Sequence, residues 1–347
     1  MKSLHESQTW RTALATFAHN MSTDIVPSGK ILITGATGLI GSALVDLLLA
    51  VRNQHGRPCS VVAAGRSLAR LQQRFDSPDG LELLEYDATA PFTPGLAFST
   101  IIHAASNASP ELYLQDPCGT LDANISGLRN ILEHARQNTS CRIIYISSSE
   151  VYGRRQQSGP ANERDYGFID PLNPRSSYAV AKRAAEAYCV AYATQHNSHV
   201  VIARPGHVYG PTATTSDRRV SSDFAFRSAR GEPLVLKSDG SQIRSYCHCL
   251  DCATAILTIL AHGTPATAYN ISNPDSVISI RTMASLLAKA GGVSITIGTP
   301  TNAERAAFNP IQDSSLDADR LLSLGWRGTL TAHDGLSQTV QVLKEIL

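Results

Sequence analysis

The stretch "KILITGATGLIG", residues 30–41, decides the fold. Its apolar start predicts a buried strand, and Gly35, Gly38 and Gly41 predict a tight turn that leads into a helix. In such a turn the first glycine permits the bend, the second lets the backbone approach a phosphate, and the third lets the helix pack on the strand. Free N–H groups at the helix N-terminus attract phosphate. The stretch therefore predicts a dinucleotide-binding strand–turn–helix unit.

Outward from this unit, short apolar runs alternate with helical stretches up to residue 205. Continuous apolar strands that alternate with helices predict a parallel sheet covered on both faces. The expected fold class is α/β, a doubly wound parallel Rossmann sheet with a smaller, interleaved C-terminal α+β lobe. The expected strands are residues 30–36, 60–66, 81–88, 99–106, 141–149 and 199–205, and the main expected helices are 38–53, 121–137 and 176–196.

The chain divides into three expected parts. The N-terminal extension has amphipathic spacing at Trp10, Leu14 and Phe17, which predicts a surface helix docked on the main body. The stretch 244–260, "RSYCHCLDCATAILTIL", is expected to return to the main sheet as a strand and a helix. The expected boundaries are 1–28 for the extension, 29–205 plus 242–263 for the dinucleotide-binding domain, and 206–241 plus 264–347 for the substrate lobe.

Composition excludes several functional classes. The chain has 347 residues, 43% of them hydrophobic, and a formal net charge of +1, so no strong field attracts nucleic acid or an anionic membrane. No apolar run reaches the roughly 18 residues of a spanning helix, and the N-terminus lacks an apolar signal-peptide core. We expect neither nucleic-acid nor membrane partners, and a cytoplasmic location by default.

Seven cysteines are spread through the chain without a disulfide pattern. The cluster "CHCLDC" at 247–252 resembles a metal-binding motif, but no second pair of ligands is apparent elsewhere. Small buried cysteines explain the cluster better, and we predict no metal site.

The end of the second strand, "AAGRS", indicates which dinucleotide binds. An acidic residue there holds the ribose of NAD, whereas Arg66 with Ser67 suits the 2′-phosphate of NADP. NADP is therefore mildly favoured over NAD. Asp87, at the end of the third strand, can reach the adenine amino group. The other expected cofactor contacts are Thr37, Leu39, Ile40, Ala88, Ala104, Ala105, Asn124, Tyr178, Lys182, Pro205 and Val208.

The stretch "SSYAVAK" contains Tyr178 and Lys182, four apart on one helix and therefore on the same face. A tyrosine with a pKa near ~10 is a poor base, but a neighbouring ammonium favours its phenolate. The fifth strand ends in "SSSEVYG", which brings a hydroxyl, Ser148, to the same sheet edge. Together the three side chains predict removal of a substrate hydroxyl proton as hydride passes to the cofactor.

These segments, in this order, resemble the extended short-chain dehydrogenase/reductase family, which includes nucleotide-sugar epimerases, dehydratases and decarboxylases. The resemblance rests on GATGLIG, SSSEVYG, YAVAK, "RPGHVYGP" at 204–211 and "GSQIRSYCHCLDCA" at 240–253, and it runs from about residue 29 almost to the C-terminus. It implies a nucleotide-diphosphate sugar substrate, a helix-bending role for Asn124 near the active site, and a homodimer formed through helices 116–138 and 176–196.

Within that family the segments are most similar to the UDP-glucuronate decarboxylase branch. The similarity places Ser109 and Tyr113 near the hexose, and Arg219 and Arg244 on the diphosphate or the uronate. Dehydratases commonly carry Asp-Glu after the catalytic hydroxyl residue, where this chain has Ser149 and Glu150 in its substrate and catalytic positions. Loss of carbon dioxide needs no acid for a leaving group, so Ser-Glu suits decarboxylation, although some dehydratases also have it.

Three residues depart from that branch. His207 and Asp223 stand where the branch usually has Asn, both near the substrate phosphates, and Arg66 stands where NAD-binding members have an acid. The predicted activity is oxidation of the sugar at C4, followed by loss of carbon dioxide or water with help from Glu150. The alternatives are a 4-epimerase, an NADPH-dependent 4-keto-sugar reductase, and a non-catalytic cofactor-binding protein.

Overall fold

The computed structural model describes residues 2–56, 59–76, 78–92, 95–106, 108, 110–301 and 311–347. Within these residues seven parallel strands form the main sheet, in the order β10-β6-β5-β4-β1-β2-β3. The predicted doubly wound parallel sheet is confirmed. The strands are β1 (Gly29–Thr34), β2 (Cys59–Gly65), β3 (Leu81–Glu85), β4 (Thr100–His103), β5 (Arg142–Ile146), β6 (His199–Pro205) and β10 (Ala268–Ile271).

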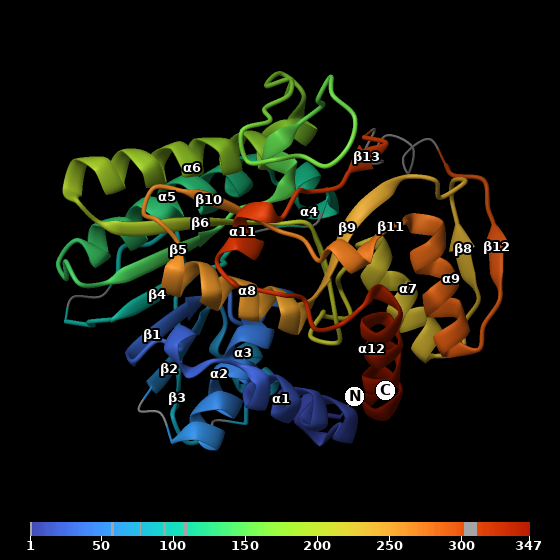
Figure 1. Cartoon of the computed structure of the whole chain (residues 1–347), viewed down its shortest axis with the longest axis horizontal. Helices are drawn as coiled ribbons and strands as arrows, with labels where there is room; N and C mark the ends of the chain where they lie inside the picture. Colours follow the sequence, from blue (N-terminus) through green and yellow to red (C-terminus); the bar gives the residue numbers. More distant parts are fainter. Residues whose placement is uncertain are drawn as a thin grey trace.

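Helices cover both faces of this sheet (Figure 1). Alternate residues of β1 face opposite sides, so Ile31 and Ile33 join one buried apolar cluster and Leu32 joins another. The first cluster includes α2 (Leu39–His55) and α8 (Cys249–His262), and the second includes α5 (Pro117–Ala135) and α6 (Ser177–His196). The short α3 (Leu68–Arg74) packs beside β2 and β3.

The strand order reverses between β1 and β4, which are neighbours although β2 and β3 separate them in sequence. Ligands of open parallel sheets bind in the crevice beyond the carboxyl ends of the strands at such a point. The glycine turn after β1 and the serines after β5 therefore meet at one edge of the sheet.

One sequence-based expectation is wrong. The strand predicted from the stretch 244–260, β9 (Ile243–His248), does not return to the main sheet. It pairs in parallel with β7 (His207–Tyr209) and antiparallel with β11 (Val277–Ser279), so both of its edges are taken within the second lobe. The following helix, α8, does pack on the main sheet, and β10 completes that sheet from within the segment expected to be substrate lobe.

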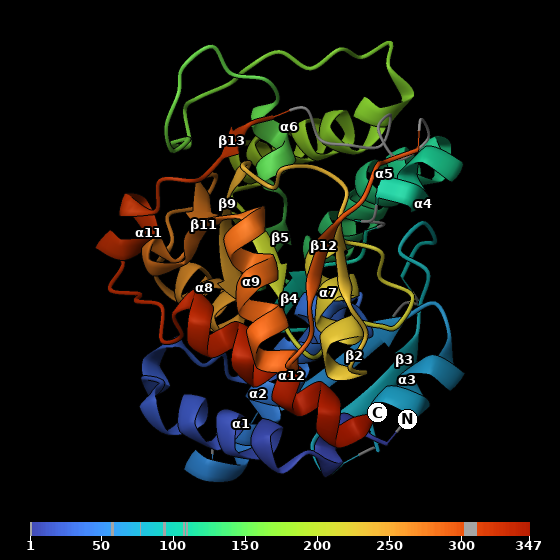
Figure 2. The same cartoon turned by 90° about the vertical axis from the view of Figure 1, so that its right-hand side faces the viewer.

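The second lobe lies to the right in Figure 1 and faces the viewer in Figure 2. Three of its helices, α7, α9 and α12, pack against one another. Beside them β8 and β12 form a parallel pair. The helices and strands of this lobe have these bounds: α7 (Val220–Ala229), β8 (Leu234–Leu236), the short η5 (Pro274–Ser276), α9 (Ile280–Gly291), β12 (Ile295–Ile297), β13 (Asp313–Ser314), α11 (Asp319–Ser323) and α12 (Ala332–Ile346).

The predicted docking of the N-terminal helix is confirmed. In α1 (Gln8–Asn20), Trp10, Leu14 and Phe17 are buried, and the Trp10 indole N–H donates to Asp46 of α2 at 3.0 Å. The residue before α1, Ser7, also contacts the C-terminal helix: its hydroxyl donates to Glu345 of α12 at 2.6 Å. Both termini consequently lie close together, as Figure 2 shows.

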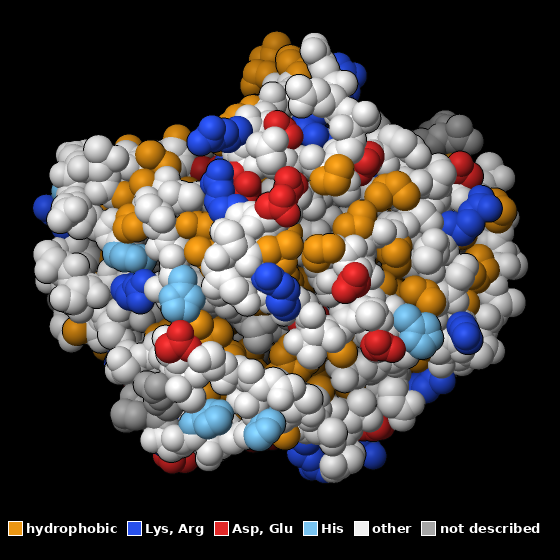
Figure 3. Space-filling view, in the orientation of Figure 1, with side chains coloured by type: hydrophobic (Ala, Val, Ile, Leu, Met, Phe, Trp, Pro, Cys, Tyr) orange, Lys and Arg blue, Asp and Glu red, His pale blue; other side chains and the backbone are white. Residues whose placement is uncertain are grey.

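The face of the molecule in Figure 3 has Lys and Arg side chains interspersed with Asp and Glu, without a broad region of one sign. This mixture is what the formal net charge of +1 leads us to expect. In the described ranges, no helix is both long and apolar enough to cross a membrane.

Candidate active site

The glycine turn after β1 forms a cradle that any side chain would fill. Gly35 has a φ of +69°, in the left-handed region, and a Cβ there would lie 2.7 Å from the Ala104 carbonyl oxygen. A Cβ on Gly41 would lie 2.3 Å from the Gly35 carbonyl oxygen. Gly38, the residue before α2, brings no side chain over the first turn of that helix. The turn at the switch point therefore fits the pyrophosphate of a dinucleotide.

The residues predicted for the adenosine end gather at the carboxyl ends of β2 and β3. Asp87 accepts hydrogen bonds from the N–H and hydroxyl of Thr89, both at 2.9 Å. The Thr89 N–H and the nearby Arg66 charge lower the pKa of Asp87. Arg66 is exposed, and the Ser67 hydroxyl caps α3 by accepting from the Arg70 N–H. Arg66 and Asp87 thus share one end of the crevice.

The other predicted cofactor residues line the same edge. Ala105 donates its N–H to Thr34, whose hydroxyl also contacts His103 Nδ1 at 2.8 Å, so the end of β4 is tied to β1. Asn124 is buried inside α5, donates to the Thr120 carbonyl, and accepts from the Tyr145 hydroxyl. Half-buried positions are Thr37, Ile40, Ala104 and Ala105, and buried ones are Leu39, Ala88, Pro205 and Val208.

Ser148, Tyr178 and Lys182 come together at the carboxyl end of β5. Ser148 precedes the short helix η3 (Ser149–Tyr152), while Tyr178 and Lys182 occupy the first turns of α6. Burial raises the pKa of Tyr178 to about 12, although a hydrogen bond with Ser148 opposes that rise. The Lys182 ammonium lies 5.7 Å from the centre of the Tyr178 ring. The geometry therefore joins the three predicted catalytic side chains.

Lys182 is almost completely buried and donates to the Ile146 carbonyl at 2.7 Å. Burial lowers its pKa to about 7, against the charge of Glu186 one turn further along α6. A lysine in this state changes charge near neutral pH, so its protonation is sensitive to its surroundings.

Glu150 lies among cations and phenols at the same edge. Its carboxylate is 3.8 Å from the guanidinium of Arg175, in η4 (Pro174–Ser176). Its charge opposes ionisation of Tyr113 and Tyr178 by raising the pKa of each, after burial. Glu150 also counteracts the fall that burial causes in the pKa of Arg244. Glu150 is therefore placed to act electrostatically on the reacting groups.

Tyr113 stacks on the catalytic tyrosine. It belongs to α4 (Pro110–Gln115), is 2% exposed, and its ring centre lies 5.3 Å from that of Tyr178, with the planes at 12°. The stack fixes the orientation of the Tyr178 ring. Ser149 is half-buried in η3. The predicted contact Ser109 lies outside the described residues.

Arg219, Arg244 and His207 face the site from the second lobe. Burial, together with the charges of Arg244 and Arg219, lowers the pKa of His207 to about 3. Arg244 is 3% exposed and donates to the Ile243 and Gln312 carbonyls. His207 is therefore a neutral imidazole beside two guanidinium groups.

Two acids close in sequence to Arg219, Asp217 and Asp223, have partners of their own. Asp217 forms an ion pair with Arg219, in which Oδ2 of the carboxylate lies 2.5 Å from Nη2 of the guanidinium. Asp223 lies 3.5 Å from Arg227 on α7, in an exposed ion pair. The negative charge that Asp223 has in place of a neutral Asn is thus paired with Arg227.

Sequence reasoning missed several residues of this edge: His103, Arg175, Glu186, Arg204 and Asp217. Arg175 precedes Tyr178 by three residues, a spacing that could have predicted its place on the same side of the helix start. Glu186 continues the four-residue spacing of Tyr178 and Lys182. Arg204 pairs with Glu186 from another strand, a contact that no local pattern indicates.

Cys247, Cys249 and Cys252 are buried beside the apolar core. Burial raises the pKa of Cys249 to about 12, which disfavours the thiolate that a metal requires. His248 caps α8 by accepting the Leu250 N–H. Across the described ranges, no group of three or more His, Cys, Asp and Glu residues is arranged to hold a metal ion.

Residues 31–272 match the family model described as the NAD dependent epimerase/dehydratase family. UDP-glucuronic acid decarboxylase 1 of Xenopus tropicalis is 29% identical over 324 residues, which cover 92% of this chain and 73% of that protein. UDP-glucuronic acid decarboxylase 3 of Arabidopsis thaliana is 34% identical over 251 residues, covering 72% of this chain and 70% of that protein.

Solved structures share the fold. The UDP-glucose 4-epimerase of Thermotoga maritima with UDP-glucose superposes with a TM-score of 0.76 at 22% identity, over 90% of this chain and 98% of that one. A dTDP-glucose 4,6-dehydratase of Streptomyces venezuelae with NAD bound gives 0.75 at 24% identity, over 91% and 97%. With the matching family model and the two relatives, the conclusion is that this chain belongs to the NAD dependent epimerase/dehydratase family.

Proposed function

We propose that the protein is an NAD(P)-dependent enzyme that oxidises C4 of a nucleotide-diphosphate sugar and then removes carbon dioxide from it. The observation that supports this most strongly is the meeting of Ser148, Tyr178 and Lys182 beside the glycine cradle. A bound dinucleotide supplies the hydride acceptor for C4. The relatives named UDP-glucuronic acid decarboxylase support the same class of substrate.

In this reaction Tyr178 takes the proton of the C4 hydroxyl. Its pKa of about 12 already includes the lowering effects of the Ser148 hydroxyl and the Arg219 charge, and it must fall further for the phenol to act as a base. A positive charge at Lys182, 5.7 Å from the centre of the ring, favours the phenolate. Tyr113, stacked on the phenol, keeps the ring from turning away. The protein's part is therefore to orient the phenol and stabilise its anion.

The resulting C4 ketone supplies the electron sink for decarboxylation. The C5–C6 bond breaks, its electron pair moves to the C4 oxygen as an enolate, and the C6 carboxylate leaves as carbon dioxide. Protonation at C5 restores the ketone, and the hydride that a bound dinucleotide had taken would return to C4, so that the sugar loses carbon dioxide alone. No leaving group needs an acid, which agrees with Ser149 rather than Asp before Glu150.

The positive charges at the site favour a substrate that has a second anionic group in addition to its diphosphate. Arg219 and Arg244 face the site from the second lobe, and Arg175 lies beside Glu150 from the first. A uronate carboxylate gives one of these guanidinium groups a partner in bidentate geometry. Dehydration is the second candidate, because the Glu150 carboxylate beside Tyr178 can serve as the base that removes the C5 proton.

Mass spectrometry separates these candidates. The purified protein is incubated with NAD or NADP and a panel of nucleotide sugars that includes UDP-glucuronate. A loss of about 44 mass units identifies decarboxylation, a loss of about 18 dehydration, and a gain of about 2 reduction. We expect the loss of carbon dioxide. An unchanged mass with every nucleotide sugar would contradict the proposed function.

NADP is the cofactor we favour, because Arg66 stands at the end of β2 beside Asp87. Arg66→Ala is expected to weaken NADP binding by about tenfold or more, while NAD binding changes little, since only NADP has the 2′-phosphate. Isothermal titration of both cofactors measures this. The matched control is Arg129→Ala, because Arg129 is also an exposed arginine but lies on α5. Equal weakening of NAD and NADP in the Arg66 variant would refute the preference.

A further inference from the structure

The end of β5 is fastened to α6 by two buried hydrogen bonds. The Lys182 ammonium donates to the Ile146 carbonyl at 2.7 Å, and the Ser147 hydroxyl donates to Glu186 Oε1 at 2.5 Å. Lys182 and Glu186 are one helical turn apart, so they hold adjacent residues of the strand from adjacent turns.

The catalytic pair connects the same two elements. Ser148, the next residue of the chain, bonds with Tyr178, one turn before Lys182. The distance between the catalytic serine and tyrosine therefore depends on how firmly the strand end is held against the helix. Glu186 provides one of the three contacts that join the strand end to α6.

The Glu186 carboxylate forms charge-assisted hydrogen bonds with Arg204. Its oxygens accept from Nε and Nη2 of Arg204 at 2.9 and 2.6 Å, and both residues are buried. Arg204 also donates through Nη1 to the Tyr152 hydroxyl at 3.0 Å and to the Glu163 carbonyl at 2.9 Å. A bidentate pair of this kind fixes the carboxylate in one orientation.

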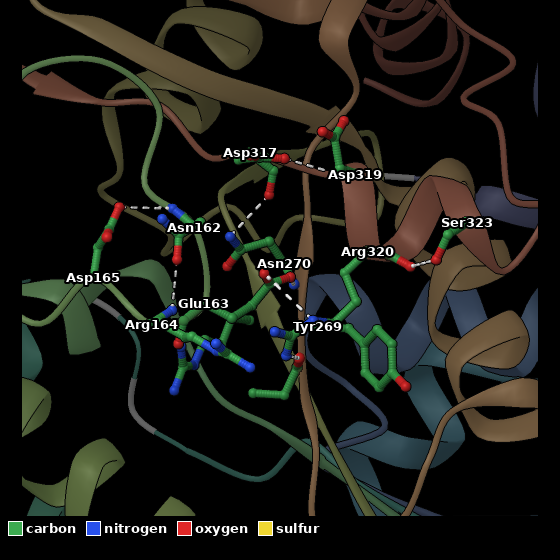
Figure 4. Close-up of polar contacts among 12 residues, drawn as sticks. Asn162, Glu163, Arg164, Asp165, Tyr269, Asn270, Asp317, Asp319, Arg320 and Ser323 are labelled. Carbon is green, nitrogen blue, oxygen red and sulfur yellow. Dashed lines mark hydrogen bonds and ion pairs between the residues drawn. The ribbon is translucent and has the colours of Figure 1, made fainter.

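Glu163 connects this set of contacts to β10 of the main sheet and to α11; Figure 4 shows Glu163, Asn270 and Arg320 together. Glu163 accepts the N–H of Asn270 in β10 at 2.9 Å, and its other oxygen lies 3.7 Å from Arg320 in α11. Asn270 donates in turn to the Asp317 carbonyl. The chain of contacts thus runs from the catalytic helix to β10 and α11.

Glu186 also supplies a negative charge to the buried lysine. His103 stays neutral because burial lowers its pKa to about 3, and burial raises the pKa of the Cys189 thiol. The Glu186 charge raises the pKa of Lys182 against the effect of burial. The titratable groups that face Lys182 are Tyr178, Glu186 and Cys189 on α6, Tyr145 on β5 and His103 on β4.

We propose that Glu186 is a positioning residue: it holds the end of β5 at the spacing that the Ser148–Tyr178 pair needs, and its charge favours the ammonium form of Lys182. The role in the reaction rests on the proposed function, whereas the effect on Lys182 is a property of the folded chain. Glu186 touches neither substrate nor cofactor in this account.

The charge effect can be measured without turnover. The chain has six lysines, and the other five are exposed or half-buried. Protein labelled with carbon-13 at the lysine Cε positions gives one signal per lysine, whose shift follows protonation, and Lys182→Arg assigns the signal of interest. Glu186→Gln is expected to move the Lys182 midpoint down by about one pH unit, since a buried opposite charge favours the ammonium.

Ser147→Ala is the matched control, because it breaks the Ser147–Glu186 bond and leaves the carboxylate in place. Its Lys182 midpoint is expected to equal that of the wild type. If Glu186→Gln fails to fold with Arg204 unpaired, the double variant E186Q/R204M removes both charges and is expected to move the midpoint in the same direction. An unmoved midpoint in the folded Glu186 variant, or an equal shift in Ser147→Ala, would overturn the proposal.

Turnover then distinguishes this proposal from the proposed function. In an active wild type, Glu186→Gln should bring the alkaline fall of kcat to lower pH, whereas Ser147→Ala should lower kcat without moving that fall. A wild type without activity on any nucleotide sugar refutes the function and leaves the titration result standing. An active wild type with unmoved midpoints refutes only the role of Glu186.

Discussion

Tyr178 illustrates how a side chain gains its role from its neighbours. Burial is the largest cause that raises its pKa to about 12, so the phenol is an inefficient base near neutral pH. Ser148 donates to it, Lys182 lies across its ring, and Tyr113 stacks on it. Each contact either favours the phenolate or fixes its direction. The reactivity and orientation of Tyr178 therefore depend on side chains from three different segments of the chain.

Glu150→Gln tests the carboxylate beside this phenol. We expect kcat to fall by about 100-fold or more, because Glu150 acts on Tyr178 and Arg244 and is the acid–base group nearest to them in η3. Cofactor affinity should stay near that of the wild type, since Glu150 is not part of the glycine cradle. Steady-state kinetics and a cofactor titration measure the two effects. A kcat within about threefold of the wild type would contradict this role.

At the scale of elements, α1 contacts both lobes of the molecule. It packs on α2 and also contacts α12, so one helix bridges the cofactor domain and the substrate lobe. Its largest buried side chain, Trp10, is 0% exposed and bonds to Asp46, which also pairs with Arg74 at 2.5 Å.

Trp10→Ala is expected to destabilise the protein by about 3 to 5 kcal/mol, the usual cost of removing a fully buried indole. The shift of the urea unfolding midpoint measures the loss. Thr16→Ala, at an exposed position of the same helix, is the control and should change stability by less than about 0.5 kcal/mol. Equal stabilities of the Trp10 and Thr16 variants would show that α1 is not a structural part of the fold.

At the scale of the whole molecule, the two ends of the chain are joined through Glu345. Hydrogen bonds from Ser7 and Thr9 lower its pKa from 4.5 to about 2. Because the folded-state pKa is depressed, the contribution to stability is present above pH 4.5 and is lost as the pH falls towards 2.

Glu345→Gln tests this linkage. Urea unfolding of the variant and the wild type at pH values of about 7, 4 and 3 should show the largest difference at pH 7 and a smaller one at each lower pH. A difference that grows as the solution is acidified would have the wrong sign and would exclude the hydrogen-bonded carboxylate as its source.

Much of this architecture could be predicted from the sequence. The family resemblance and the Rossmann sheet are confirmed, because strand–helix alternation and the glycine turn are local patterns. The neighbours of β9 could not be predicted, since an apolar strand does not specify which edge it joins. The same holds for Arg204 and Glu186, which come from different elements and pair only in the folded chain. The homodimer through α5 and α6, and the cytoplasmic location, stay predictions.

The most direct test of the central claim is the turnover of Tyr178→Phe on the nucleotide sugar that the wild type converts. The substitution removes one hydroxyl and keeps the ring that stacks on Tyr113, so cofactor affinity should be unchanged while kcat falls by about 100-fold or more. Tyr188→Phe, at a half-buried position of the same helix, should behave as the wild type. A Tyr178 variant with full turnover would contradict the account.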